Sequence, residues 1–311
     1  MGGMRAIHDD EPDLSAAAAR RLLATQCPGW AGLPLRPVEA TGTSNAMWRL
    51  GEHLVLRLPR TADAADGVLT ELAVLGHLRD RLPVAVPEIA YAGTPTHDFP
   101  YPWAVLTWSP GRDAWACLSA SELRPGAAEK AVAQALAEIV TTLRQLDPAA
   151  FPTALARRRP GERGGPIPGL DESVHEWAQV GSAAGVLDLD AVLSAWAQVA
   201  DAAYRGPFVV THGDLIPGNL LLTGTRLTGV LDWGSAALAD PAVDLLPAWT
   251  LLSRTGRRAF REQLGCQEPE WLRGKAFALQ QAIAGVAYYV PRGEAAGLFH
   301  ARSLGAVLGP E

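Results

Sequence analysis

The stretch from Phe208 to Asp232 constrains this chain more than any other, because short apolar runs alternate in it with polar residues at fixed places. The apolar runs predict strands, with a hairpin turn at Thr223-Gly224, and they cover 208–210, 220–222 and 227–231. Such strands hold the backbone rigid. We therefore expect the polar residues at the strand ends to converge on one point, namely His212, Asp214, Asn219 and Asp232.

Asp214 and Asn219 stand on either side of Pro217-Gly218, a pair that bends the chain back. Phosphoryl transfer from a nucleotide needs a carboxylate to orient the acceptor hydroxyl and take its proton, and oxygen ligands for Mg²⁺. An Asn and two Asp side chains at adjacent strand ends supply both kinds of group. A lone Asp in such a loop also has a simpler interpretation, because it often bonds only its own backbone.

The pattern His-Gly-Asp-x-x-x-x-Asn, followed by a hydrophobic strand that ends in Asp-Trp-Gly, resembles the catalytic loop and metal-binding turn of protein kinases. The His-Gly-Asp form is similar to the antibiotic kinases, namely the aminoglycoside phosphotransferase family with its macrolide kinase branch. This resemblance implies that Asp214 is the catalytic base and that Asn219 and Asp232 bind Mg²⁺. His212 is expected to be a structural hydrogen-bonding residue, and Asp244 to bond the backbone of the catalytic loop.

The resemblance covers roughly residues 35–290. It implies an α+β, two-lobed, protein-kinase-like fold, with a small N-terminal antiparallel sheet and a larger, mainly helical C-terminal lobe. We expect an N-terminal nucleotide-binding lobe at 1–104, a hinge at 105–111 and a C-terminal catalytic and acceptor-binding lobe at 112–311. In the hinge, Val105 and Thr107 are expected, by position alone, to meet the nucleotide base. The residue types there do not separate ATP from GTP.

Arg57 stands in the run Leu54–Leu58, where alternation places it on the opposite face from its leucine neighbours. A charge inside an apolar strand needs a partner. The resemblance implies that Arg57 is the cation for the nucleotide phosphates, paired with Glu71 in the next helix. It departs from the Lys of protein kinases and is similar to the macrolide kinase branch. Two alternatives stay open: Arg57 as a surface ion-pair residue of the sheet, and Glu71 as a solvent-facing helix acid.

A small polar loop between the first two predicted strands carries Thr43, Ser44 and Asn45 after Gly42. Such a loop can present hydroxyls and backbone N–H groups to phosphates. The spaced glycines of the protein kinase loop are absent, so a plain turn is an equal alternative. Its place in the chain is where the family covers the triphosphate.

The amino-acid composition limits which binding partners and which cellular compartment are expected for this protein. The chain has 311 residues, of which 48% are hydrophobic and 19% charged, and a net charge of −6 with pI near 5.7. An acidic chain argues against a nucleic acid partner and suits a cationic acceptor. Apolar runs fall short of the roughly 18 residues that span a membrane. We expect a cytoplasmic protein that has no membrane association and whose three cysteines are thiols.

Several helices are expected outside the catalytic stretch. The sequence predicts helices over 14–26, 129–146, 191–203, 242–252 and 271–290. Between them, residues 145–170 form a long loop with a basic cluster at 157–159, which is interpreted as a solvated loop end. In the antibiotic kinases, the acceptor pocket is built from such an inserted segment. Four aromatic residues of the tail are expected in the core, with the acceptor wall as the alternative: Trp249, Trp271, Tyr288 and Tyr289.

These features predict a Mg-dependent small-molecule O-phosphotransferase, which moves the γ-phosphoryl group of ATP or GTP to a hydroxyl of an aminoglycoside or macrolide. Two alternatives remain. The acceptor can be a small metabolite such as choline, homoserine or a sugar, or the chain can be a nucleotide-binding protein without catalysis. The sequence does not indicate an oligomeric state.

Overall fold

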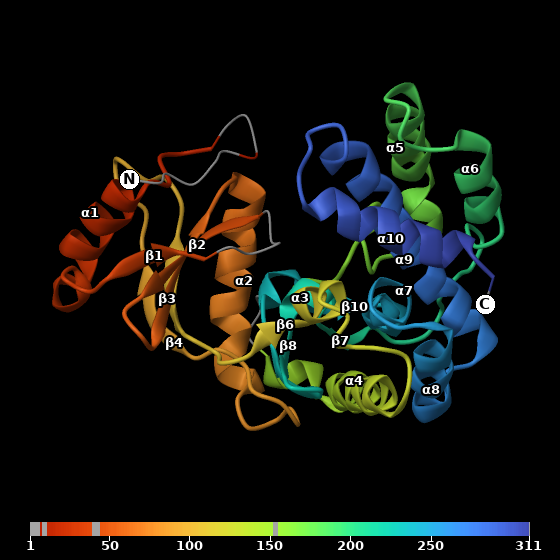
Figure 1. Ribbon diagram of the computed structural model, residues 1–311, viewed down its shortest axis with the longest axis horizontal. Helices are drawn as coiled ribbons and strands as arrows, with labels where there is room; N and C mark the ends of the chain where they lie inside the picture. The colour runs from red at the N-terminus through yellow and green to blue at the C-terminus, as the bar shows by residue number, and fades with distance from the viewer. Residues whose placement is uncertain (1–6, 8–10, 39–43, 152–154, 311) are drawn as a thin grey trace.

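The structure is a computed structural model that describes residue 7 and residues 11–38, 44–151 and 155–310. Its N-terminal part is built on an antiparallel sheet of five strands in the order β1-β2-β3-β5-β4. The remaining chain is mainly helical and lies on the other side of helix α2 (Figure 1). The strands of the sheet are β1 (Leu35–Pro37), β2 (Asn45–Leu50), β3 (Leu54–Pro59), β4 (Ile89–Gly93) and β5 (Trp103–Thr107).

Helices cover the two faces of this sheet. Helix α1 (Ala16–Gln26) starts at Ser15, whose hydroxyl accepts from the Ala18 N–H at 3.2 Å. It packs on the face that carries Leu56 and Leu58. The other face, with Val55, packs in a different apolar cluster with α2 (Ala62–Leu78). Arg57 bonds Glu71 of α2, so it lies on the α2 face, opposite Leu56 and Leu58, as the predicted alternation requires.

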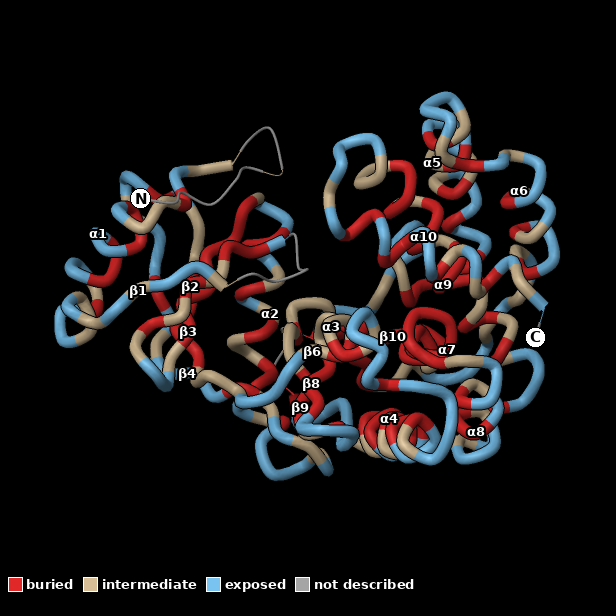
Figure 2. Tube along the Cα trace, viewed as in Figure 1, coloured by how far each residue is buried: buried red, intermediate tan, exposed pale blue. Residues whose placement is uncertain are grey.

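The helical part surrounds a second core. Helix α4 runs from Ala127 to Gln145, and its apolar stripe is buried along one side, as Figure 2 shows. Cys117 and Cys266 in this part, like Cys27 beside the sheet, are buried free thiols. The other helices are α3 (Ala114–Ser119), α5 (Asp171–Ala183), α6 (Leu189–Ala197), α7 (Pro247–Thr250), α8 (Arg254–Leu264), α9 (Glu268–Tyr289) and α10 (Ala296–Leu308).

Short strands hold the catalytic stretch between the sheet and the helices. The predicted hairpin is confirmed, and Gly224 takes a φ of +60° in its turn. The run predicted at 208–210 is shifted by one residue. The strands are β6 (Arg112–Asp113), β7 (Val209–Thr211), β8 (Leu220–Thr223), β9 (Arg226–Val230) and β10 (Ala237–Ala239), with β10 antiparallel to β7.

Two helix predictions were wrong in extent. Residues 242–252 do not form one helix: a 3₁₀ helix at Pro241–Leu245 is followed by the separate short helix α7. Pro247 lacks an N–H to continue the hydrogen-bond ladder, so a new helix begins there. The helix expected over 191–203 is α6, which ends at Ala197. None of the helices in the described part of the chain has the length and apolar composition needed to cross a bilayer.

Candidate active site

His212 holds the loop of residues 212–219 in place from a fully buried position. Its Nε2–H donates to the Leu231 carbonyl at 3.0 Å, and its Nδ1 accepts from the Asp214 N–H at 3.2 Å. The ring also packs against Trp233, with centroids 4.5 Å apart. Both ring nitrogens are thus bonded to the backbone, and the structural role expected for His212 is confirmed.

Asp244 fixes the turn at the start of the loop. Its carboxylate accepts from the His212 N–H at 2.9 Å and from the Gly213 N–H at 2.8 Å, as expected. Gly213 has a φ of +79°, and a Cβ there would lie 2.6 Å from the Ser235 carbonyl oxygen. Only glycine fits this position without strain. Burial raises the pKa of Asp244, and the neighbouring His212 partly offsets that effect.

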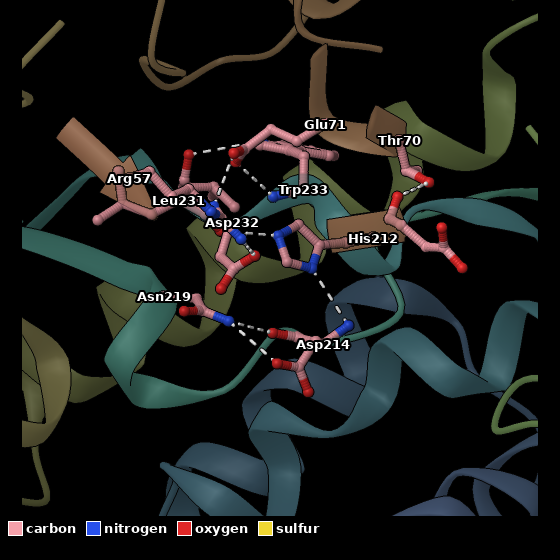
Figure 3. A network of polar contacts seen from close by, with 11 residues as sticks. Arg57, Thr70, Glu71, His212, Asp214, Asn219, Leu231, Asp232 and Trp233 are labelled. Carbon is pink, nitrogen blue, oxygen red and sulfur yellow. Dashed lines mark hydrogen bonds and ion pairs between the residues drawn. The ribbon is translucent and has the colours of Figure 1, made fainter. Parts of the chain in front are cut away.

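Asp214 and Asn219 face each other across the loop, as Figure 3 shows. The Asn219 amide donates to the Asp214 backbone carbonyl at 2.9 Å and to its Oδ2 at 3.2 Å. Because the side-chain nitrogen Nδ2 makes these bonds, the side-chain oxygen Oδ1 of Asn219 points away from Asp214. The Leu231 N–H donates to the backbone carbonyl of Asn219 at 2.8 Å, which ties this loop to the residue before Asp232.

Asp232 takes the left-handed conformation, with φ 58° and ψ 71°. This backbone costs a residue with a side chain roughly 1–2 kcal/mol, and such outliers are frequent at functional sites. It aims the Asp232 carboxylate at Arg57, whose Nη2 donates to Oδ1 at 2.6 Å. The Asp232 side chain stays 36% exposed, so part of the carboxylate remains accessible from the cleft.

Arg57 bridges two carboxylates (Figure 3). Its Nη1 donates to Glu71 Oε2 at 2.6 Å, and Glu71 Oε1 accepts from the Trp233 N–H at 3.0 Å. Arg57 is only 4% exposed and Glu71 only 1%, so neither open alternative holds: this is no surface pair, and Glu71 does not face solvent. In the amide orientation that satisfies both groups, the Asn45 oxygen accepts from Arg57 Nη2 at 2.9 Å.

The charges of this cluster depend on one another. Burial opposes the charge on Arg57, but attraction to Asp232 and Glu71 outweighs it and raises the Arg57 pKa. Burial raises the pKa of Glu71 against the pull of Arg57. At Asp232 burial works in the same direction, yet Arg57 prevails and the Asp232 pKa is lowered. Asp232 therefore keeps the ionised carboxylate that a cation would need.

The oxygen donors suit Mg²⁺, which prefers hard oxygen ligands and often takes only one or two protein carboxylates beside substrate phosphates. Asn219 offers its amide oxygen and Asp232 its partly exposed carboxylate, and both line the same cleft. Among the described residues, no group of three or more His, Cys, Asp or Glu side chains has the arrangement of a closed metal site. The two oxygen donors of Asn219 and Asp232 would suit a Mg²⁺ ion that takes its other ligands from water and phosphate.

These residues line a cleft of about 450 Å³, which is also lined by the end of β5 and the residues that follow it. Ser44, Asn45 and Thr107 line it, whereas Thr43 lies outside the described residues. Val105 does not line the cleft: its side chain is buried in the core shared with α1, and its backbone lies between β3 and β4. The cleft is lined instead by the residues that follow, 106–109.

A profile of the phosphotransferase enzyme family matches residues 35–277, which is more than half of the chain. The chain belongs to this family. It is therefore a kinase that transfers phosphate to hydroxyl groups. No curated protein sequence matches this phosphotransferase significantly.

Solved structures share the fold of this phosphotransferase. The aminoglycoside phosphotransferase APH(2″)-IIIa with GDP and kanamycin has a TM-score of 0.71 at 16% identity, over 93% of this chain and 97% of that one. Macrolide 2′-phosphotransferase MphH from Brachybacterium faecium, as apoenzyme, gives 0.58 at 24%, over 94% and 99%. A type I macrolide 2′-phosphotransferase gives 0.60 at 20%, over 99% and 100%. The predicted two-lobed, kinase-like α+β fold is confirmed.

Part of the cleft is lined by an aromatic wall, a name used here for Trp115, Tyr289, Phe299 and His300. Trp115 meets Phe299 edge-on at 5.7 Å, and Tyr289 stacks on His300 at 5.6 Å. Of the four tail aromatics considered from sequence, Tyr289 therefore lines the cleft. Trp249 and Trp271 pack on each other in the core, as expected.

Sequence reasoning missed two residues that contact Asp214. Arg163 and Gln281 each donate to Asp214 Oδ1 at 2.9 Å. They come from the long loop and from α9, which lie 51 and 67 positions from Asp214, and nothing in their local sequence marks them. The one feature of the sequence that could have indicated such a contact is the presence of arginines in the long loop.

The basic cluster at 157–159 is not simply a solvated loop end. Arg158 is partly buried and donates to the Ser235 carbonyl at 2.8 Å, and Arg157 lies over the Phe208 ring at 4.4 Å. Arg157 and Arg159 are both exposed, in line with the interpretation, so Arg158 is the member of the cluster that departs from it. The correction has a physical cause: the loop runs beside β10, so its side chains meet the turn that follows Asp232.

Proposed function

We propose that this phosphotransferase moves the γ-phosphoryl group of ATP or GTP to a hydroxyl of a small, antibiotic-like molecule and depends on Mg²⁺. The observation that carries the proposal is one cleft lined by Asp214, Asn219, Asp232 and the Arg57–Glu71 pair. The same cleft is also lined by residues 106–109 and by the aromatic wall. We infer that the nucleotide and the acceptor share this cleft, with Asp214 between them.

In this proposal, Asp214 orients the acceptor hydroxyl. Its Oδ2 accepts only a 3.2 Å bond from Asn219 among the contacts of the described residues, so lone pairs remain for an O–H donor. As the hydroxyl oxygen bonds to the γ-phosphorus, the bond from that phosphorus to the β,γ-bridging oxygen breaks. The proton passes to Asp214 and the nucleoside diphosphate leaves with the bond's electron pair.

Mg²⁺ held by Asn219 and Asp232 would supply charge neutralisation for the phosphate oxygens. Arg57 contributes a fixed positive charge beside Asp232 and, through its planar fork, holds Glu71 at the same time. We infer that it stabilises the nucleotide phosphates mainly through this arrangement of the cluster.

The nucleotide base is proposed to contact the backbone of residues 106–109. The Thr107 N–H already donates to the Glu88 carbonyl at 2.9 Å, and the Trp108 N–H donates to the His53 carbonyl at 2.8 Å. The base would therefore use the other backbone groups of this segment. Such groups can serve adenine or guanine, so the donor is proposed as ATP or GTP.

The lining of the cleft favours an acceptor with an apolar face over a polycation. Among the described residues that line the cleft, every carboxylate already has a partner. Glu71 and Asp232 hold Arg57, Asp214 holds Arg163, and Asp113 accepts from the Ala116 N–H at the start of α3. An aminoglycoside with several amines would find few free acids, whereas a macrolide-like ring can pack on the aromatic wall.

The test is release of nucleoside diphosphate from ATP and from GTP, with Mg²⁺, across a panel of macrolides, aminoglycosides, choline, homoserine and sugars. Stimulation by a macrolide supports the proposal in full. Stimulation by choline, homoserine or a sugar alone makes the chain a metabolite kinase. Nucleotide binding without turnover on any acceptor supports a binding protein without catalysis.

The Asp214→Ala variant tests the chemistry itself. General-base positioning typically contributes about 10²- to 10⁴-fold, so turnover should fall by that order while nucleotide affinity stays nearly the same. Asp190→Ala, at an exposed acid in the first turn of α6, is the control and should keep full turnover. Equal turnover in Asp214→Ala would show that Asp214 is not the base.

A further inference from the structure

We propose that Arg163, assisted by Gln281, is a positioning residue for Asp214 and sets the rate of phosphoryl transfer without contacting either substrate. The inference rests on the proposed role of Asp214 as base. The observation behind it is that the two oxygens of the Asp214 carboxylate accept hydrogen bonds from different residues. Oδ1 accepts from Arg163 and Gln281, both at 2.9 Å, and Oδ2 accepts from Asn219 at 3.2 Å.

The position of these donors separates their role from substrate binding. Asp214 and Asn219 line the cleft, whereas Arg163 and Gln281 are not among its lining residues. Both side chains bond Oδ1, the oxygen that Asn219 does not use, and Gln281 is only 9% exposed. Arg163 thus acts on the carboxylate rather than on the phosphates.

The loop that carries Arg163 is anchored firmly enough to hold a side chain in place. At one end, the Arg158 N–H donates to the Leu238 carbonyl at 2.9 Å, and the Leu238 N–H donates to the Ala156 carbonyl at 3.0 Å. At the other end, the Asp240 N–H donates to the Gly164 carbonyl at 2.9 Å. The residue next to Arg163 is therefore fixed to the segment that follows β10.

Charge balance gives this contact a catalytic consequence. Two carboxylates, Asp214 and Asp232, face a site that is proposed to take a polyanionic triphosphate. Arg57 pairs with one of them at 2.6 Å, and Arg163 pairs with the other at 2.9 Å. Without Arg163, the charge of Asp214 would stand uncompensated beside the phosphates, and only the neutral donors Gln281 and Asn219 would hold its carboxylate in place. Both changes raise the barrier of transfer more than they weaken binding.

A purely structural role, in which the ion pair only pins the loop, makes a different prediction. Loss of an ion pair that only anchors the loop would lower stability and disturb the aromatic wall, so the acceptor KM and the melting temperature would change. Loss of a positioning residue lowers kcat and leaves KM and nucleotide Kd nearly unchanged. The two roles are therefore distinguished by which constant moves.

The experiment compares Arg163→Met with Arg159→Met, which removes an exposed arginine from the same loop. The acceptor is the one that the panel identifies. We expect kcat of Arg163→Met to fall about 10- to 100-fold, the range seen when a group that orients a site residue is removed. Acceptor KM and nucleotide Kd should stay within about threefold. Arg159→Met should match the wild type.

Three further variants keep the test decisive if Arg163→Met folds poorly. Arg163→Lys keeps the charge and should recover part of kcat. Arg163→Ala should regain turnover when guanidinium is added at millimolar concentration. Gln281→Met should lower kcat by a smaller factor than Arg163→Met, because a neutral donor bonds a carboxylate more weakly than a charged one.

The inference is overturned if kcat of Arg163→Met stays within about twofold of Arg159→Met, or if the loss appears in KM and melting temperature with kcat unchanged. Its failure is distinguishable from failure of the proposed function. If Asp214→Ala loses turnover and Arg163→Met does not, only the role of Arg163 falls. If Asp214→Ala keeps turnover, the proposed base itself is wrong.

Discussion

His300 should make this protein lose stability in mild acid. The ring lies in α10, 9% exposed, stacked on Tyr289 and against Gly285, where a Cβ would lie 2.1 Å from the ring. Nδ1 finds no hydrogen-bond partner among the described residues. Burial, with a smaller contribution from the charge of Arg163, lowers the pKa of His300 from 6.5 to about 4.

The sign and size of the effect follow from these two values. The unfolded chain binds a proton on His300 below pH 6.5, whereas the folded chain resists it until about pH 4. The stabilisation from neutral His300 is therefore complete above pH 6.5 and is lost as the pH falls toward 4. At pH 5, proton linkage with these values gives a loss of about 2 kcal/mol relative to pH 7.

The assay is urea unfolding at pH 7 and pH 5 for the wild type, His300→Phe and His97→Gln. Phe keeps the stacked ring and cannot titrate. Its extra bulk against Gly285 costs about 1–3 kcal/mol at both pH values, so it cancels from the difference. The fully exposed His97 is the control and should keep the wild-type difference.

The result that supports the reasoning is a smaller loss of stability between pH 7 and pH 5 in His300→Phe, by about 2 kcal/mol. Other titrating groups act alike in both proteins and cancel. If His300→Phe and the wild type lose the same free energy over this range, burial does not hold His300 neutral. The account of its pKa would then be refuted.

Two further predictions concern the catalytic cluster. Glu71→Ala leaves the buried Arg57 with one carboxylate instead of two, so the free energy of unfolding in urea should fall by about 3 kcal/mol; unchanged stability would show that the pair is dispensable. Gly213→Ala forces a Cβ to 2.6 Å from the Ser235 carbonyl oxygen, whereas Gly224→Ala, at φ +60°, meets open space. Gly213→Ala should therefore lower the melting temperature clearly more than Gly224→Ala, which carries only the roughly 1–2 kcal/mol of a left-handed residue; equal decreases would contradict the steric argument.

Local pattern predicted much of the fold because it reflects local physics. The period of two along β3 placed Arg57 opposite its leucine neighbours, and the structure has it on the α2 face. The helix predicted over 129–146 was likewise visible in the sequence, since the apolar stripe of α4 depends on residues three or four positions apart. Pro247 shows the limit: an apolar run suggested one helix, but a missing N–H divides it.

Some residues of the candidate site were predictable from local sequence, and others were not. The sequence by itself determined the loop with Asp214 and Asn219, and the turn with Asp232, because short strands fix the spacing of their ends. Only the tertiary structure decided that Arg163 and Gln281 contact Asp214, and that Val105 lies in the core rather than in the cleft. Contacts across 51 or 67 positions depend on how whole elements pack, and no periodicity in one segment records which partner another segment will bring.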